Sequence, residues 1–293
     1  MKNIKIIAPS SYVPDLTGDK LKGVEELFSK LKYNINCGKY IFEKKYFLAG
    51  KDEERLADLI DAFFDKKNDV IMALRGGAGA LHLLDKIDYK LISQNKKPFF
   101  GFSDCTALQN AFYERSGLSS FSGFWIRDVL EDIAPLTKKT LIKCLKNQPQ
   151  TFKAPFLSEG KVSGILLGGN LKVFTSLLGT PYFPNMKDKI LILEDISEAP
   201  FQIDNMLMHL KLAGVFGQIK GLILGDFSRV GTEKEKRILD DMIKEYFTKA
   251  PYPVARLKKY SHEKGHVVIP FGGMVHMDSK KRTITLDKLK KIS

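Results

Sequence analysis

Residues 98–108 read Pro98-Phe99-Phe100-Gly101-Phe102-Ser103-Asp104-Cys105-Thr106-Ala107-Leu108, an apolar run that leads through a serine into a helical pattern. The apolar run predicts a buried strand, and the helical pattern continues to a stop at Gly117. A second strand candidate, residues 69–74, ends in the glycine-rich stretch 75–79. Both stretches therefore predict a strand that ends in a tight turn.

The same alternation extends along the first half of the chain. Residues 4–8 form a short apolar run, while residues 19–31 and 52–64 carry apolar side chains at helical spacing. Strands that alternate with helices predict a largely parallel sheet with helices on both faces. Active sites of such sheets form in loops at the carboxyl ends of the strands, where both glycine-containing turns fall.

These patterns divide the chain into two predicted α/β domains. Residues 1–147 are expected to form a doubly wound, largely parallel sheet domain of the flavodoxin or Rossmann type. Residues 148–161 interrupt the pattern with two prolines and a glycine, and we expect them to be a linker. Residues 162–293 are expected to form a smaller, mixed β/α domain of the swivelling type.

The composition is that of a globular protein, with 44% hydrophobic and 28% charged residues in a chain of 293. No apolar run approaches the roughly 18–20 residues of a membrane-spanning helix, and the N-terminus lacks the apolar core of a signal peptide. Cys37, Cys105 and Cys144 are odd in number and widely spaced, which favours neither a disulfide framework nor a zinc site. We therefore expect a cytoplasmic protein without a membrane partner.

The formal net charge of +13 raises the hypothesis of nucleic-acid binding. The lysines are spread along the whole chain, and only residues 280–291 are densely basic. A lysine-rich surface that helps to attract an anionic small substrate is therefore the better interpretation, and no nucleic-acid partner is expected.

Ser103 is the first candidate for chemistry. At a strand-to-helix turn its hydroxyl is exposed, the helix N-terminus favours negative charge, and the next backbone N–H can act as an oxyanion donor. The simpler interpretation is that Ser103 only caps its helix, and the local sequence alone favours it. The turn is not the G-x-S-x-G elbow of α/β-hydrolases, because Cys105 stands at the final glycine position.

The loop Arg75-Gly76-Gly77 is the second candidate. It lacks the lysine of a phosphate-binding P-loop, but its glycines allow a backbone N–H to approach a substrate carbonyl. Arg75 is suited to holding a substrate carboxylate in a bidentate pair.

A serine nucleophile needs a base and an acid that orients it. Of the five histidines, two fall in helical stretches, and His262, His266 and His276 remain open as the base. Glu194 follows an apolar strand and is a candidate acid, although a strand-end glutamate also pairs readily with a lysine.

Six segments, in the right order, resemble the LD-carboxypeptidases, a serine peptidase family that also contains the microcin C immunity peptidases. They are Ile-Ile-Ala-Pro-Ser-Ser at 6–11, Arg-Gly-Gly at 75–77, Gly-Phe-Ser-Asp at 101–104, Gly-Gly-Asn-Leu at 168–171, Leu-Glu-Asp at 193–195 and Gly-His at 265–266.

The resemblance implies roles for particular residues. Ser103 is expected to be the nucleophile, His266 the general base and Glu194 the acid that orients it. The backbone N–H groups of Gly77 and Asp104 are expected to form the oxyanion hole, in a cleft between the two domains.

Substrate contacts are expected from Arg75, Gly76 and Trp125. Two departures from the family pattern bear on this pocket. Ala78 stands where a bulkier residue, often tyrosine, is usual, and residues 119–125 replace an expected His-Gly-Pro sequence. Substrate recognition on that side is therefore expected to differ.

The activity implied is that of a serine carboxypeptidase that hydrolyses an L,D-peptide bond. It releases the terminal D-alanine of murein tetrapeptides in cell-wall recycling, without a metal or organic cofactor. The alternatives are a microcin C immunity-type peptidase that cleaves a peptidyl- or aminoacyl-nucleotide, and a non-catalytic muropeptide-binding protein. The stretch 198–200 favours the murein branch. A homodimer remains open, because the sequence does not give the oligomeric state.

Overall fold

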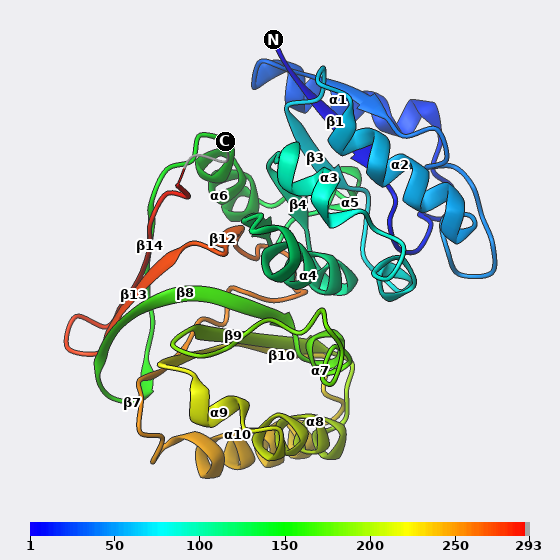
Figure 1. Cartoon of the computed structure of the whole chain (residues 1–293). Coiled ribbons are helices and arrows are strands. Elements are labelled where there is room, and N and C mark those ends of the chain that lie inside the picture. Colours follow the sequence, from blue (N-terminus) through cyan, green and yellow to red (C-terminus); the bar gives the residue numbers. More distant parts are fainter. Residues whose placement is uncertain (291–293) are drawn as a thin grey trace.

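The computed structural model describes residues 1–290 and contains two sheets, each with helices packed against it (Figure 1). Residues 291–293, the end of the expected C-terminal domain, lie outside the described residues. A six-stranded sheet belongs mainly to the N-terminal half, and an eight-stranded sheet belongs to the C-terminal half. The expected α/β fold with a parallel sheet followed by a mixed one is confirmed.

The six-stranded sheet has the strand order β12-β5-β4-β3-β1-β2. Its strands are β1 (Lys2–Ile7), β2 (Tyr33–Cys37), β3 (Val70–Ala73), β4 (Phe99–Gly101), β5 (Ser120–Ser122) and β12 (Ile269–Phe271). The first five are parallel and follow the doubly wound order 2-1-3-4-5 of flavodoxin-like sheets. β3 and β4 are buried along their whole length, which explains their uninterrupted apolar sequences.

The helices of this half begin and end at recognisable signals. They are α1 (Gly18–Lys30), α2 (Asp52–Phe64), η1 (Ala80–Leu83), α3 (Tyr89–Gln94), η2 (Ser103–Cys105), α4 (Thr106–Ser116), α5 (Arg127–Leu130) and α6 (Pro135–Leu145). Thr17 caps α1 by accepting a hydrogen bond from the N–H of Lys20. Gly117 ends α4 in the left-handed conformation with a φ of 63°, as its position in the sequence predicts.

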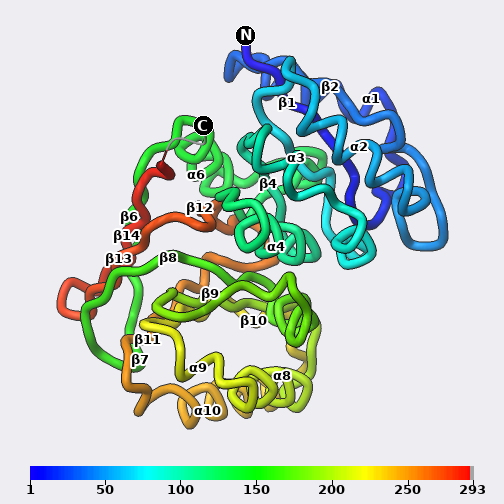
Figure 2. The backbone as a smooth tube through the Cα atoms, in the orientation of Figure 1, coloured from blue at the N-terminus to red at the C-terminus, as the bar shows by residue number. Residues whose placement is uncertain are grey.

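The eight-stranded sheet has the order β6-β14-β13-β8-β9-β10-β11-β7. Its strands are β6 (Gln150–Lys153), β7 (Phe156–Ser158), β8 (Lys161–Asn170), β9 (Ile190–Ile196), β10 (Gly221–Ser228), β11 (Val254–Arg256), β13 (Met274–Asp278) and β14 (Thr283–Leu286). Four neighbouring strands, β8 to β11, are parallel. β6, β13 and β14 lie together at one end of the sheet in antiparallel pairs (Figure 2).

Four helices belong to this half: α7 (Leu171–Thr175), α8 (Pro200–Leu212), α9 (Val215–Gln218) and α10 (Glu233–Phe247). The last three cover one side of the parallel strands (Figure 1). On the other side, Ile192 and Ile223 share a buried cluster with Phe102 of the N-terminal half. The residue before Ser103 is thus packed against the second sheet.

Two features differ from the expected domain boundaries. Residues 148–161 are not only a linker, because they contain β6 and β7, which lie at opposite edges of the eight-stranded sheet. In addition, β12 pairs antiparallel with β5 and completes the N-terminal sheet. The chain between β11 and β12 therefore passes from the second sheet to the first.

Direct hydrogen bonds join the two halves beside the Ser103 turn. The side chain of Asn110 in α4 donates to the carbonyl of Gly168 at 2.7 Å and accepts from the N–H of the same residue at 3.3 Å. The hydroxyl of Thr106 accepts from the N–H of Asn170 at 3.0 Å. Because α4 begins just after Ser103, these bonds fix the serine turn relative to the carboxyl end of β8.

Within residues 1–290, none of the helices combines the length and apolar character needed to cross a bilayer.

Candidate active site

Ser103 stands on a strained turn between β4 and α4. Its φ of 60° lies in the left-handed region that residues other than glycine rarely adopt, and its side chain is partly exposed. The N-cap positions of η2 and α4 are Phe102 and Cys105, so the interpretation of Ser103 as a simple helix cap is wrong. Strain of this kind is typical of functional positions.

Gly76 allows the loop after β3 to approach this turn closely. A Cβ at Gly76 would lie 2.8 Å from the Cβ of Ser103 and 3.1 Å from Cζ3 of Trp125. Even alanine would therefore push the turn away, which gives a physical reason for the glycine.

Asp104 and Cys105, which follow Ser103, are buried parts of the turn and are not alternative nucleophiles. The buried carboxylate of Asp104 accepts a hydrogen bond from the N–H of Ala80 at 2.8 Å, and burial raises its pKa. The backbone N–H of Asp104 lies in the first turn of a helix, where donors have no helical acceptor. Cys105 is fully buried, and burial raises the pKa of its thiol to about 12, so a reactive thiolate is disfavoured.

The glycine loop brings Gly77 and Arg75 to the same place. Gly77 has a φ of 112°, and a side chain there would collide with Ser11. The Arg75 guanidinium donates to the carbonyl of Tyr12 at 3.0 Å, and a Cβ on Gly77 would lie 3.7 Å from its Nη2. Burial lowers the pKa of Arg75. A cation thus lies next to the expected oxyanion donor.

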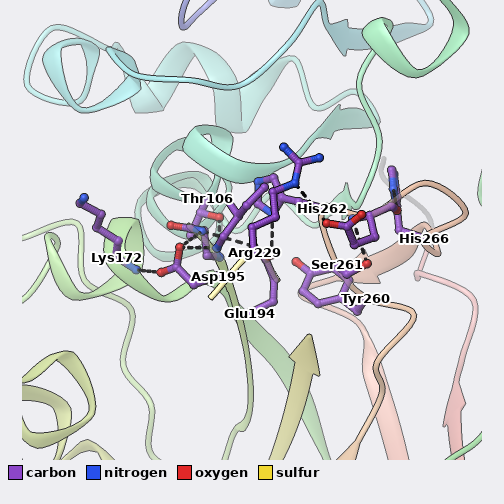
Figure 3. Close-up of polar contacts among 12 residues, drawn as sticks. Thr106, Lys172, Glu194, Asp195, Arg229, Tyr260, Ser261, His262 and His266 are labelled. Atoms are coloured by element: carbon purple, nitrogen blue, oxygen red, sulfur yellow. Dashed lines mark hydrogen bonds and ion pairs between the residues drawn. The ribbon is translucent and has the colours of Figure 1, made fainter. Parts of the chain in front are cut away.

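His262 and Glu194 form a buried histidine–carboxylate pair (Figure 3). The pair lies beside the serine turn, because the His262 ring packs on Phe102, the residue before Ser103. Nδ1 of His262 lies 2.6 Å from Oε2 of Glu194, a residue of β9 that is fully buried. The imidazole packs against the rings of Phe102 and Trp125, with centroids 4.6 and 5.7 Å away. Its Nε2 is buried and has no hydrogen-bond partner among residues 1–290. An imidazole held by a carboxylate through Nδ1 presents Nε2 as a proton acceptor.

The surroundings of Glu194 hold its carboxylate in place. The amide of Asn170 donates to Oε1 of Glu194 at 3.4 Å and to Oδ1 of Asp195 at 3.0 Å. Asp195 also accepts the backbone N–H of Lys172 at 2.9 Å. Burial, followed by the charge of Glu194, raises the pKa of Asp195 to about 6. The sequence suggested no role for Asn170, although it lies in the Gly-Gly-Asn segment.

The expectation that Glu194 orients His266 is wrong. His266 directs Nδ1 to the carbonyl of Glu263 at 3.1 Å, and its Nε2 lies 3.4 Å from Oδ2 of Asp128. The carboxylate of Glu194 instead contacts His262, another of the three histidines that the sequence offers as a base. The preceding glycine made His266 look like the family histidine, but packing of the loop decides which ring meets the acid.

The other candidate base lies elsewhere. His276 is on β13, where its ring contacts Ser163 at 2.7 Å and Asp287 at 3.1 Å. Both its nitrogens are engaged there, outside the cluster around Phe102.

A pocket of about 210 Å³ opens beside the two histidines of the β11–β12 loop. Trp125 and Thr137 contribute to its walls. Three exposed ion pairs surround it, namely Arg127–Glu131, Arg229–Glu263 and Lys264–Asp132. Exposed pairs of this kind rearrange at little cost, so they leave the pocket adaptable to charged ligands.

Trp125 is partly buried between the serine turn and this pocket. Its ring lies 5.2 Å from that of Phe102 and 5.7 Å from that of His262. It is therefore part of the packing around the histidine and also lines the pocket.

No group of three or more His, Cys, Asp and Glu side chains is arranged to hold a metal ion in the part of the chain that the structure describes.

A serine on a strained turn and a histidine–carboxylate pair beside it are the constituents of a serine hydrolase site. Comparison with known protein families agrees. The LD-carboxypeptidase N-terminal domain matches residues 4–123, and the LD-carboxypeptidase C-terminal domain matches residues 163–277. The chain belongs to the LD-carboxypeptidase family of serine carboxypeptidases, as the sequence motifs predict.

Individual relatives support the same family. The chain is 33% identical to a probable murein peptide carboxypeptidase of Bacillus subtilis (strain 168), over 97% of this chain and 91% of that protein. It is 28% identical to a putative carboxypeptidase of Treponema pallidum (strain Nichols), over 97% and 91% of the two chains.

Solved structures share the whole fold. The muramoyltetrapeptide carboxypeptidase of Oxalobacter formigenes is 29% identical with a TM-score of 0.87, over 99% of both chains. An MccF-like protein of Bacillus anthracis strain Ames is 26% identical with a TM-score of 0.88, over 98% of this chain and 97% of that one.

Proposed function

We propose that this protein is a serine LD-carboxypeptidase that releases the terminal D-alanine from murein tetrapeptides. Ser103 is the nucleophile, His262 the general base and Glu194 the acid that orients it. The observation that carries the proposal is the 2.6 Å contact between His262 and the buried Glu194 beside the strained serine turn. The similarity to murein peptide and muramoyltetrapeptide carboxypeptidases supports the substrate class.

In the acylation step, Ser103 Oγ attacks the carbonyl carbon of the L-centre while Nε2 of His262 takes its proton. The carbonyl oxygen becomes negatively charged, and the N–H groups of Gly77 and Asp104 stabilise it. The C–N bond then breaks, and His262 gives the proton to the amine of the departing D-alanine. The peptide remains as an ester on Ser103.

In the deacylation step, a water molecule gives a proton to His262 and attacks the ester carbon. The tripeptide leaves with a new carboxylate, and Ser103 recovers its proton. Glu194 accepts the Nδ1–H of His262 and keeps the imidazole in the tautomer that exposes Nε2. Arg75, whose guanidinium lies beside Gly77, holds the carboxylate of the terminal D-alanine.

The test is to incubate the protein with free murein tetrapeptide and measure the product masses. Loss of one alanine, abolished in Ser103→Ala, supports the proposal. An unchanged tetrapeptide, or release of alanine by the Ser103→Ala protein, would contradict it. A tetrapeptide that ends in L-alanine is the matched control substrate and should not be cleaved.

The alternative substrate is an aminoacyl-nucleotide of the kind named for MccF. MccF has been solved with glutamyl sulfamoyl guanosine, and it shares this fold at 23% identity with a TM-score of 0.85. Turnover of an aminoacyl sulfamoyl adenosine compared with turnover of the tetrapeptide separates the two. We expect kcat/KM to favour the tetrapeptide, and the opposite preference would select the alternative.

We further propose that the reaction takes place in the cytoplasm, on muropeptides returned during cell-wall recycling. The three free cysteines are consistent with a reducing compartment. Accumulation of tetrapeptides in the cytosolic fraction of cells that lack the protein is the expected result, and unchanged tetrapeptide pools would contradict it.

A further inference from the structure

His266 is a buried histidine to which the proposed triad gives no role. Its side chain is only 4% exposed, yet its Nε2 has no hydrogen bond within residues 1–290 and lines the pocket beside His262. Nδ1 lies 3.1 Å from the carbonyl of Glu263, and Nε2 lies 3.4 Å from the carboxylate of Asp128. Both ring nitrogens face acceptors, which favours a proton on each and therefore the imidazolium.

The same residue anchors the loop that carries His262. The carbonyl of His266 accepts a hydrogen bond from Thr137 Oγ1 of α6 at 2.7 Å. Two residues on, the N–H of Val268 donates to Thr140 Oγ1 of α6 at 3.0 Å. Asp128 belongs to α5. The loop is thus attached to two helices of the half that carries the nucleophile.

Both imidazoles share one neighbour. The ring of His266 stacks on Phe102 with an interplanar angle of 23° and a centroid distance of 5.5 Å, and that of His262 lies 4.6 Å from the same ring. Phe102 directly precedes Ser103. A movement of the loop would therefore shift the base relative to the nucleophile, and misplacement by about 1 Å can cost roughly 100-fold in rate.

We propose that His266 is a positioning residue: paired with Asp128, it holds loop 261–266 against α5 and α6 and so sets the position of His262 beside Ser103. The inference rests on the proposed roles of Ser103 and His262. It does not depend on which peptide is cleaved, because it concerns the base and the nucleophile alone.

The pairing makes this support dependent on protonation. Burial lowers the pKa of His266, but the close contact with the negative charge of Asp128 and the carbonyl of Glu263 outweigh it, so the net pKa is raised. The other ionisable groups that face it or line its pocket are Glu194, His262, Lys264, Arg127, Glu131, Asp132 and Arg229. As pH rises through the raised pKa, His266 loses its charge and the pair with Asp128 weakens.

The experiment uses the full-length protein and the rate at which a fluorophosphonate labels Ser103, measured from about pH 6 to about pH 10. Asp128→Asn is expected to lower the labelling rate about tenfold and to move its alkaline limb down by about one pH unit, because it removes the charge that keeps His266 protonated. Asp128→Glu should restore both. In His266→Gln, Ser103 should be labelled slowly, and the labelling rate should show no fall at alkaline pH from this group.

The matched controls come from another histidine–aspartate pair, on β13 and after β14. Nε2 of His276 lies 3.1 Å from Oδ2 of Asp287, at a distance from the site. The fluorophosphonate should label Ser103 in His276→Gln and Asp287→Asn at the wild-type rate. The positioning role would be overturned if Asp128→Asn and His266→Gln were labelled at the wild-type rate and had the same alkaline limb in the pH profile as the wild type.

The readouts also separate this inference from the proposed substrate. Wild-type protein that labels at Ser103 but releases no D-alanine rejects the substrate, while the pH profiles still decide the role of His266. Wild-type protein that does not label at Ser103 overturns both. Thermal unfolding of each variant checks that a slow labelling rate does not reflect loss of the fold. In the reaction with the tetrapeptide, the variants should have a lower kcat and an unchanged KM.

Discussion

The loop between β11 and β12 contains two buried histidines, four residues apart, that pack against the same phenylalanine. His262 meets Glu194 through Nδ1 at 2.6 Å, and neither side chain is more than 7% exposed. His266 meets Asp128 through Nε2 at 3.4 Å, and the carboxylate is 15% exposed. Nε2 of His262 has no hydrogen-bond partner within residues 1–290. In His266, by contrast, Nδ1 contacts the backbone carbonyl of Glu263.

The difference shows that burial beside an acid does not by itself make a histidine a base. A base needs one nitrogen fixed and the other free to accept a proton. His262 satisfies this, because Glu194 takes Nδ1 and Nε2 has no partner in the described chain. His266 has an acceptor at each nitrogen, so it is suited to carrying a charge and holding the loop in place.

The largest expected effect separates the two acids. Glu194→Gln should lower kcat for D-alanine release by about 10⁴-fold, because the amide no longer fixes the tautomer that exposes Nε2 of His262. Asp128→Asn should lower it only about tenfold. Steady-state kinetics at pH 7 measure both, and equal losses would remove the distinction between the two pairs.

The next effect is a loss of unfolding free energy when either end of the β11–β12 loop loses the hydrogen bond that anchors it. Tyr260, just before His262, is fully buried and its hydroxyl lies 2.8 Å from Ser122 Oγ. Tyr260→Phe should cost about 1–2 kcal/mol of unfolding free energy, because it leaves the serine hydroxyl unpaired. Thr137→Val should cost a similar amount at the His266 end. Urea denaturation measures both, and a neutral result for either would show that the anchor is dispensable.

The sequence predicts most of the fold because the decisive signals are local. Apolar runs that end in glycine or serine turns identify β3 and β4, and the helical spacing of residues 19–31 and 52–64 corresponds to α1 and α2. The edges were harder to predict. β6, β7 and β12 are three or four residues long, and their existence depends on partners distant in the chain.

The site divides in the same way. Ser103 comes shortly after β4 and Glu194 lies in the last part of β9, and the apolar runs before them reveal both positions in the sequence. The choice of histidine cannot, because it depends on how Tyr260 and Phe102 pack in the finished fold. The contact of Asp128 with His266 cannot be predicted from the sequence either, since a lone aspartate on a short helix carries no signal.

The smallest expected effect is on stability as a function of pH. The pKa of His266 is raised in the folded protein, so its pairing contributes fully below the unfolded pKa of about 6.5 and is lost as pH rises through the folded value. The free energy of unfolding of the wild type should therefore fall relative to that of Asp128→Asn as pH rises across this window. Urea unfolding at several pH values measures the difference, and a constant difference would contradict the charged pair.

The central claim is that His262, not His266, is the base for Ser103. The direct measurement is kcat for D-alanine release from murein tetrapeptide by His262→Gln and His266→Gln, side by side at neutral pH. A loss on the order of 10⁴-fold for His262→Gln, against a loss of about tenfold for His266→Gln, is the predicted result. Retention of activity by His262→Gln together with its loss in His266→Gln would contradict it.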